Sequence, residues 1–343
     1  MAVKAYSSQM KPADRHTETN STVSGLPRTN SPWPALMPRR QFLTLTGAGL
    51  VTSGLALGGK SPAVAAPEPG TPSPSKTRLP TTTEIRNYLL QNSPWVDQRN
   101  TVDTVKSGNP DRPVKKAGVA WFPSRWDIQA AVRSNCDLLI VHEPAFWEHS
   151  AAEKKWRDRG PGIAKSKLLS ENGLVILRAH DTWDNWPELG IRDSWAKFLG
   201  LTRRHREGTQ LRWTAVYEIP ETTLRDFAHH VAGRTRSLGE PTVQVLGEPA
   251  MKVCHPAIGV GCVVPDREMV DFGADVLVVC FDGASYWQHR ERLVEMRVGI
   301  ITVEHGSSEM PGLMSLRDHL ATRFPEVEFT WIAEHPRPWT VTS

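Results

Sequence analysis

The sequence predicts an α/β fold built from two similar lobes, each with a mixed or parallel sheet. One observation is that short runs such as Asp137–Val141 and Val298–Val303 are apolar on both faces, as strands of a buried parallel sheet are. Another is an internal repeat, because the order strand, turn, helix, strand at residues 114–141 returns at residues 255–279. We expect the two lobes to face each other across a shared cleft.

The repeat is also visible in individual residues. Pro123-Ser124-Arg125 in the first unit corresponds to Pro265-Asp266-Arg267 in the second. After the second strand, the first unit has His142-Glu143, whereas the second has Cys280-Phe281. If both units share an ancestor, only the first kept the polar strand end. The alternative is a chance similarity between two units of the same type.

Capping residues and apolar runs predict the other elements in order. Thr81-Thr82-Thr83-Glu84 is a capping box for a helix that runs to about residue 91. Gly200 ends another helix, and the last helix holds Pro311 in its first turn. Strands are expected at residues 114–122, 137–141, 174–177, 211–219, 298–303 and 328–332, and helices at residues 123–134, 165–171, 193–199, 222–235 and up to about 324.

Composition excludes several classes of protein. The chain has 343 residues, enough for about two domains, with 23% charged and 39% apolar residues, as is ordinary for a soluble protein. The net charge is +4, but no block of Lys and Arg is long enough to indicate nucleic-acid binding. No stretch is long and apolar enough for a stable membrane span. The 4 cysteines do not form a disulfide framework, and we expect them to remain thiols.

Residues 1–66 are predicted to be a disordered leader followed by a signal peptide. Residues 1–36 are polar and rich in Ser, Thr and Pro, which predicts disorder, or untranslated sequence upstream of a true start at Met37. Arg39-Arg40 then precedes an apolar run and Ala63–Ala66. This is the order of basic, apolar and cleavage regions in a signal peptide.

The paired arginines are typical of the twin-arginine export class. The alternative is a membrane anchor, but the apolar run Thr44–Gly58 is too short and too rich in Gly for a stable span. We therefore expect cleavage near Ala65 and export to the bacterial periplasm or the cell exterior. Residues 67–80 are rich in Pro, Ser and Thr and are predicted to be an extended linker.

Three predicted strands end with a histidine and a carboxylate close together. They are followed by His142 and Glu143, by His180 and Asp184, and by His305 and Glu309. In open α/β sheets, ligands gather at the carboxyl ends of the strands. Imidazole with carboxylate suits zinc, manganese or iron better than calcium. The number of candidates exceeds the need of one tetrahedral ion and fits two ions that share a bridging water. The alternative is that these groups are solvated or cap helices.

Three segments resemble those of hexameric dinuclear-metal-centre proteins, a family labelled as homologues of a type 2 GTP cyclohydrolase I. Val141–Trp147 is similar to the family's His-His-Pro segment. Ala179–Asp184 is similar to its Ala-His-Thr-x-x-Asp segment, and Glu304–Leu313 to its Gly-His-x-x-x-Glu-x-Pro-Gly-Leu segment. The resemblance covers roughly Thr81 to Ile332. It implies two α/β lobes with the site between them and a toroidal homohexamer.

The resemblance also implies the site residues. It places the ligands of two divalent ions on His142, Glu143, Asp184, His305 and Glu309. His180 lies beside them, and His180 and Asp184 are the expected catalytic residues, one as a proton shuttle and the other to position the ions. In this arrangement the first lobe is expected at residues 81–206 and the second at residues 207–295. Residues 296–343 form a strand-helix-strand segment that completes the metal site.

Two departures from the family pattern bear on function. Glu143 stands where the family has a second histidine, which adds negative charge and favours a harder ion, or leaves one metal position weak or empty. In the second lobe, Cys280–His289 replaces the family's Gly-(Asp/Glu)-x-x-x-His segment, so a substrate contact there is expected to differ. The predicted export signal is also unusual for the family.

Nearby aromatic and polar residues leave further alternatives open. Trp147, Trp183 and Trp186 follow the predicted ligands and could line a cleft for a ring or base, or could pack in the core or a subunit interface. Glu148 and His149 could be further ligands or a general acid, or simply part of a polar loop.

Two functions follow from this sequence. The first is a metal-dependent hydrolase in which a metal-bridged water attacks a small-molecule substrate, such as a phosphoester, an amide or a ring carbon. The second is a metal-binding assembly protein without catalysis, whose ring presents a surface to a partner.

Overall fold

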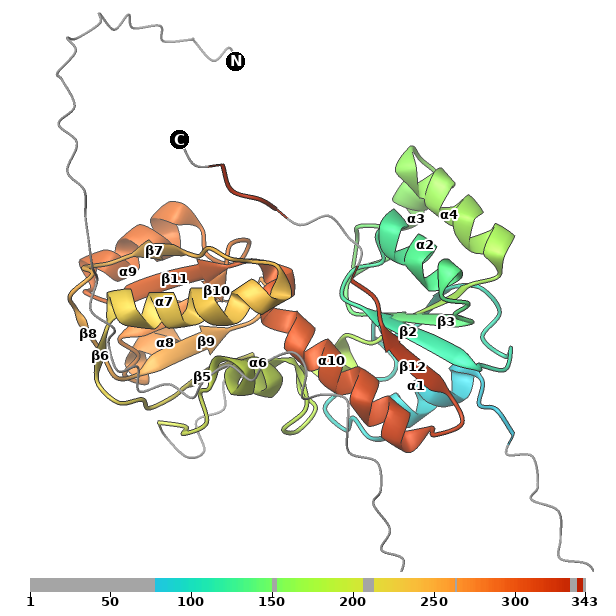
Figure 1. Cartoon of the computed structure of the whole chain (residues 1–343), viewed down its shortest axis with the longest axis horizontal. Coiled ribbons are helices and arrows are strands. Elements are labelled where there is room, and N and C mark those ends of the chain that lie inside the picture. The colour runs from blue at the N-terminus through green and yellow to red at the C-terminus, as the bar shows by residue number, and fades with distance from the viewer. Residues whose placement is uncertain (1–77, 150–152, 206–212, 263, 334–337, 342–343) are drawn as a thin grey trace, which may run out of the picture. The chain divides into compact units, whose positions relative to one another are not determined.

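The computed structural model describes residues 78–149, 153–205, 213–262, 264–333 and 338–341 (Figure 1). The predicted leader, the signal peptide and most of the predicted linker lie outside these residues. None of the described helices is long and apolar enough to cross a membrane. All four cysteines are free.

The first sheet has five strands in the order β1-β4-β3-β2-β12. β12, β2, β3 and β4 run parallel, and β1 is antiparallel to β4 at the edge. Every residue of β3 is buried, which explains why this strand is apolar on both faces. The strands are β1 (Val105–Ser107), β2 (Lys116–Ala120), β3 (Leu138–Val141), β4 (Val175–Arg178) and β12 (Glu328–Trp331), and the helices of this part are α1 (Thr82–Gln91), α2 (Arg125–Arg133), α3 (Glu153–Arg157) and α4 (Pro161–Asn172).

The second sheet has five strands in the order β5-β9-β10-β11-β7. Its three central strands are parallel, and both edge strands are antiparallel to their neighbours. A separate two-stranded sheet pairs β6 (Thr222–Thr223) with β8 (Lys252–Val253). The strands of the second sheet are β5 (Thr214–Val216), β7 (Gln244–Leu246), β9 (Pro256–Gly259), β10 (Val276–Cys280) and β11 (Gly299–Val303), and its α-helices are α7 (Leu224–Thr235), α8 (Asp266–Asp271) and α9 (Arg292–Glu295).

The two sheets contain the repeat that the sequence predicts. β2-α2-β3 and β9-α8-β10 are both parallel strand pairs joined by a helix. Asp137 Oδ2 accepts hydrogen bonds from the backbone N–H groups of residues 115–116, and Asp275 Oδ2 accepts from those of residues 254–255. Equivalent carboxylates thus hold the first strand of each unit. The predicted α/β fold with mixed sheets is confirmed.

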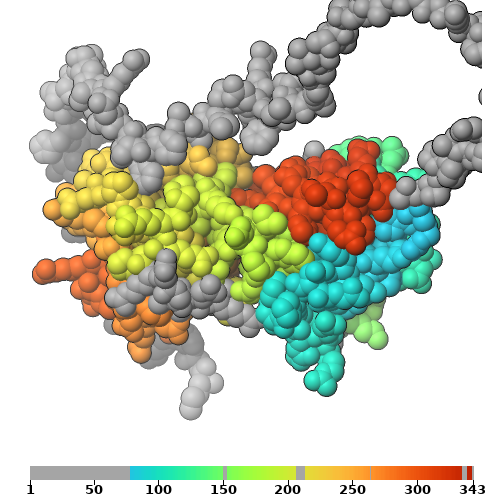
Figure 2. Space-filling model, turned by 90° about the horizontal axis from the view of Figure 1, so that it is seen from below, coloured from blue at the N-terminus to red at the C-terminus, as the bar shows by residue number. Residues whose placement is uncertain are grey.

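One long helix connects the two sheets. α10 (His305–Arg323) begins after β11 of the second sheet and leads to β12 of the first. It packs against α6 (Ile191–Leu199), β2 and β10. Figure 2 shows this red segment against the blue part of the chain that includes α1, where Tyr88 Oη lies 2.8 Å from His319 Nε2. These contacts fix the helix whose first two turns bear two of the predicted ligands.

The predicted start of this helix is wrong. Pro311 lies well inside α10, which begins at His305 after Glu304, an N-cap residue with extended backbone. A proline within a helix leaves the carbonyl four residues earlier without its helical hydrogen bond, which is why the sequence favoured a later start. The Gly and Ser residues of the first turn offer no apolar spacing that could have revealed it.

Candidate metal centre

His142 and Glu143 are placed by the end of β3. Their backbone N–H groups both donate to the carbonyl oxygen of Trp121, at 3.1 and 2.9 Å, just beyond the neighbouring strand β2. Both side chains are buried, with 0% and 7% exposure. Two adjacent polar residues therefore leave the parallel sheet at its carboxyl end and remain inside the protein.

His180 and Asp184 are placed by α5 (Asp181–Asp184), a single helical turn after β4. The buried carboxylate of Asp103 accepts hydrogen bonds of 2.7 to 3.0 Å from the backbone N–H groups of residues 180–182. Because these N–H groups have no partner within the helix, a carboxylate there stabilises the turn. The spacing of four residues then sets His180 Nδ1 3.4 Å from Asp184 Oδ2.

The first two turns of α10 supply His305 and Glu309, also four residues apart. His305 Nε2 lies 2.9 Å from Glu309 Oε1. Glu309 is 3% exposed, and its other oxygen accepts a 2.7 Å hydrogen bond from the indole N–H of Trp121. His305 Nδ1 lies 2.7 Å from Asp282 Oδ2, in the loop after β10. Trp121, directly after β2, and the loop after β10 therefore orient the two side chains.

The structure brings all the predicted ligands together. His142 Nε2 lies 3.3 Å from Asp184 Oδ1 and 3.7 Å from Glu309 Oε2. His305 Nε2 lies 3.5 Å from Glu143 Oε1. Among the described residues, two triads have ligand atoms within 4.8 Å of one another, and both contain His142. One triad is His142, His180 and Asp184, and the other is His142, Glu143 and Glu309.

The state of His142 fits a metal ligand. Its Nδ1 lies 3.1 Å from the carbonyl oxygen of Ala179, so the ring donates there. In the neutral, metal-binding form of the ring, the lone pair of Nε2 would then be directed at the carboxylates. This Nε2 is buried and has no hydrogen-bond partner in the described structure. A buried polar atom without a partner is unfavourable, and a cation between it and the carboxylates would satisfy it.

The electrostatics of the centre favour a cation. Burial opposes protonation of His142, but the neighbouring carboxylates, above all Glu309, outweigh it and raise the pKa of His142 to about 9. The pKa of His305 is also raised despite its burial, by Glu309 and Asp282. Without an ion, the site therefore holds protons to balance its carboxylates, and a divalent ion would take their place.

Several residues that support the centre carry no signal in the sequence. Trp121, Asp103 and Asp282 contact ligands or their backbone from distant segments. Gly261 comes close enough that an added Cβ would lie 3.1 Å from Glu309 Oε1, and its φ of +60° favours glycine. The sequence reveals the spacing of histidine and carboxylate, but it does not reveal these supporting contacts.

The structure distinguishes between the alternative roles of Glu148, His149 and Trp183. His149 Nε2 lies 3.5 Å from Glu143 Oε2, so His149 borders the site, whereas Glu148 pairs with Lys155 at 3.9 Å. Burial and nearby cations lower the pKa of His149 to about 4, which leaves its ring neutral at pH 7. Trp183 is fully buried and donates to the carbonyl oxygen of Gly312, so it packs against α10.

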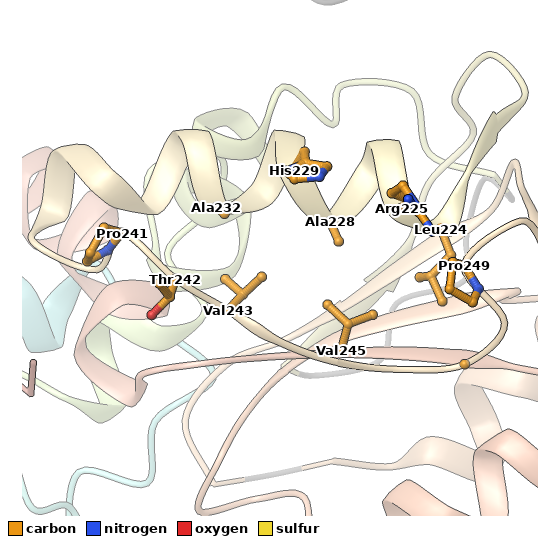
Figure 3. A pocket seen from close by; sticks show the side chains of 11 residues that line it. Leu224, Arg225, Ala228, His229, Ala232, Pro241, Thr242, Val243, Val245 and Pro249 are labelled. Carbon is orange, nitrogen blue, oxygen red and sulfur yellow. The ribbon is translucent and has the colours of Figure 1, made fainter. Parts of the chain in front are cut away.

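A separate hollow lies far from these residues in the chain. It has a volume of about 400 Å³ and is lined by α7 and by the segment 241–249, with side chains such as Leu224, Val243 and Val245 (Figure 3). None of the predicted ligands lines it. Its wall is mainly apolar, so it lacks the clustered imidazoles and carboxylates that mark the metal centre.

Residues 85–338 match the Duf34/NIF3 (NGG1p interacting factor 3) family. The chain belongs to the NIF3 family. Among NIF3 relatives, the GTP cyclohydrolase 1 type 2 homolog of Allochromatium vinosum is 23% identical over 247 residues, which are 71% of this chain and 93% of the relative. The homolog of Deinococcus radiodurans is 24% identical over 212 residues, which are 57% and 72% of the two chains. The family predicted from the three motifs is thus confirmed, whereas the hexameric ring stays a prediction.

Solved structures show the same fold. The hypothetical protein SA1388 of Staphylococcus aureus aligns with a TM-score of 0.63 and 17% identity, over 76% of this NIF3 chain and 99% of its own. The protein ybgI, described as of unknown function, aligns with a TM-score of 0.62 and 21% identity, over 76% and 100% of the two chains. At these identities the likeness establishes the fold and not the activity.

Proposed function

We propose that this protein binds two divalent cations and hydrolyses a small-molecule substrate. The observation that carries the proposal is the pair of ligand triads that share His142, whose buried Nε2 has no hydrogen-bond partner among the described residues. In the proposed site, Asp184 would hold one ion beside His180. Glu143, His305 and Glu309 would hold the other ion. His142 would bind one of the two ions, because only the lone pair of its Nε2 is available. When bound, such ions supply Lewis acidity and lower the pKa of water to near neutrality.

The protein's own groups have distinct parts in this proposal. Asp184 contacts both His142 and His180, so its carboxylate positions that side of the site. His180 is more exposed than the other site imidazoles apart from His149, at 22% for its side chain, and can exchange protons with solvent. The indole of Trp121 holds Glu309 in place. Because imidazole and carboxylate are mixed and Glu143 adds an oxygen ligand, manganese, iron or zinc are the expected metals.

Metal content and turnover together test the proposal. Protein purified from its host and analysed for metals should carry about two ions per chain. It should also hydrolyse a substrate from a panel of phosphodiesters, nucleotides and amides, and Asp184→Ala should lose both one ion and the turnover. Two bound ions without turnover on the whole panel would favour the non-catalytic assembly protein instead. No bound ions would contradict both functions.

We also propose that the chain is exported and forms a homo-oligomer, a hexamer by resemblance. The basis for export is Arg39-Arg40 before an apolar run, in a part of the chain outside the described residues. Replacing both arginines by lysine should retain the protein in the cytoplasm of its host, as measured by cell fractionation. Unchanged export would refute the twin-arginine route.

Light scattering of the purified protein should give the mass of six chains, and the mass of a monomer would refute the ring.

A further inference from the structure

A second polar hollow borders the metal centre. It has a volume of about 600 Å³, and its charged lining side chains come from Lys106, Glu153, Lys154 and Arg157. His149 lines the side of the hollow that is next to the metal centre. Its Nε2 lies 3.5 Å from Glu143 Oε2, and its ring centroid lies 5.5 Å from that of His180. A molecule in this hollow would therefore lie one imidazole away from the proposed ions.

The hollow carries an excess of positive charge. Among the described residues that line it, there are three cations and one carboxylate, and two of the cations share that carboxylate. Arg157 Nη2 lies 3.0 Å from Glu153 Oε1, and Lys106 Nζ lies 3.8 Å from Glu153 Oε2. The Lys106 side chain is only 11% exposed, so water screens its charge poorly. A partly buried cation without a full partner is unfavourable, and an anionic ligand would stabilise it.

A buried guanidinium adds to this charge from behind His149. The Arg178 side chain is fully buried, and its Nη2 lies 3.0 Å from His149 Nδ1. Its Nε donates to the carbonyl oxygen of His142, while its Nη1 is buried without a partner in the described structure. The carboxylate of Glu143 lies 3.9 Å away and is also needed at the metal centre. A buried cation therefore lies directly behind His149, between the hollow and the carboxylates of the proposed site.

We propose that the substrate carries a phosphate group that binds in this hollow, while its reacting bond lies at the metal centre. Two lysines supply point charges and an arginine supplies a fork, the combination that suits phosphate oxygens. The two excess positive charges match a phosphate monoester, which carries a charge of about −1.5 to −2 at pH 7. His149 separates the hollow from the ions, so the phosphate serves recognition. This assignment rests on the proposed hydrolase function.

Calorimetry with inorganic phosphate tests the proposal on the full mature chain with its metals. Wild-type protein should bind phosphate saturably. Lys106→Gln and Lys154→Gln should each weaken binding at least about tenfold, because a hydrogen bond to a charged group is lost. The matched control is Lys167→Gln, an exposed lysine on α4 that pairs with Glu171 and does not line the hollow. The control should bind phosphate as the wild type does.

Two further binding measurements distinguish the possible outcomes. Phosphate binding should persist after the metals are removed with a chelator, and its loss would show that phosphate binds the ions and would overturn the proposal. Acetate should bind at least tenfold more weakly, and equal affinity would overturn the choice of phosphate. Equal phosphate affinity in both lysine variants and the control would also refute it. Lys154 is exposed, so Lys154→Gln should fold even if Lys106→Gln does not.

The metal content of the same samples distinguishes this proposal from the function it rests on. Bound metals without phosphate binding would refute the phosphate site and leave the metal centre unaffected. Phosphate binding that depends on Lys106 and Lys154, in a chain that never takes up metals, would refute the hydrolase and leave an anion-binding site.

Discussion

Replacing Asp184 by asparagine tests the division of the metal centre into two triads. Asp184 is 8% exposed, and its two oxygens lie 3.3 Å from His142 Nε2 and 3.4 Å from His180 Nδ1. Asparagine keeps the shape and the backbone hydrogen bond from residue 184 to the carbonyl of His180, so α5 should remain. It removes one negative charge and one ligand oxygen from a single triad.

The expected loss of metal-binding free energy in Asp184→Asn follows from the charges. A pair of unit charges 4 Å apart is worth about 4 kcal/mol at an effective dielectric constant of 20, so a dication loses at most about 8 kcal/mol. Water that replaces the carboxylate recovers part of this energy. Because loss of a supporting contact alone weakens metal binding about 10- to 100-fold, we expect at least about 100-fold, or about 2.7 kcal/mol, for the loss of a ligand.

The assay is elemental analysis after dialysis against manganese, together with calorimetry. Wild type should retain about two ions per chain and Asp184→Asn about one, because the triad of His142, Glu143 and Glu309 is intact. The matched control is Asp318→Asn, a carboxylate on α10 whose side chain is 67% exposed. Two tightly held ions in Asp184→Asn, with an unchanged circular dichroism spectrum, would refute the division into two triads.

Three further predictions concern the supporting contacts and pH. Trp121→Phe removes the donor to Glu309 and should weaken metal binding about 10- to 100-fold by calorimetry, whereas Trp126→Phe, an exposed control, should not. Asp103→Asn weakens the cap of α5 and should lower the free energy of unfolding by about 2 kcal/mol in urea, and an unchanged value would contradict that role. In chelated protein, the raised pKa of His142 stabilises the fold fully below about pH 6.5, and this contribution should be lost as pH rises through about 9. Urea unfolding between pH 6 and 10 measures it, and a stability that rises over this range would contradict the assignment.

The sequence predicted the parts of the fold that are encoded locally. β3 and β11 were found because all their residues are buried and all except Thr302 are nonpolar. α6 was found because Gly200 ends it in the left-handed conformation. The edge strands β1 and β7 were missed. Each has three residues and is buried on at most one face, so neither shows a distinct pattern.

The ligands of the candidate site could be predicted from the sequence, but the residues that hold these ligands in place could not. A histidine and a carboxylate four residues apart lie on one face when the segment is helical, so His180 with Asp184 and His305 with Glu309 carried a signal. Trp121 and Asp282 meet these ligands only after both sheets and α10 have assembled. Such contacts depend on tertiary structure, and no spacing along the chain specifies them.

Strand ends and helix turns that are distant in the sequence are expected to hold divalent ions jointly. Anomalous diffraction from crystals of the manganese-loaded protein tests this arrangement. We expect two manganese peaks per chain, one bonded by Asp184 and one by Glu309, with His142 Nε2 at bonding distance from one of them. Manganese peaks only at the protein surface, with His142 Nε2 still unbonded, would contradict it.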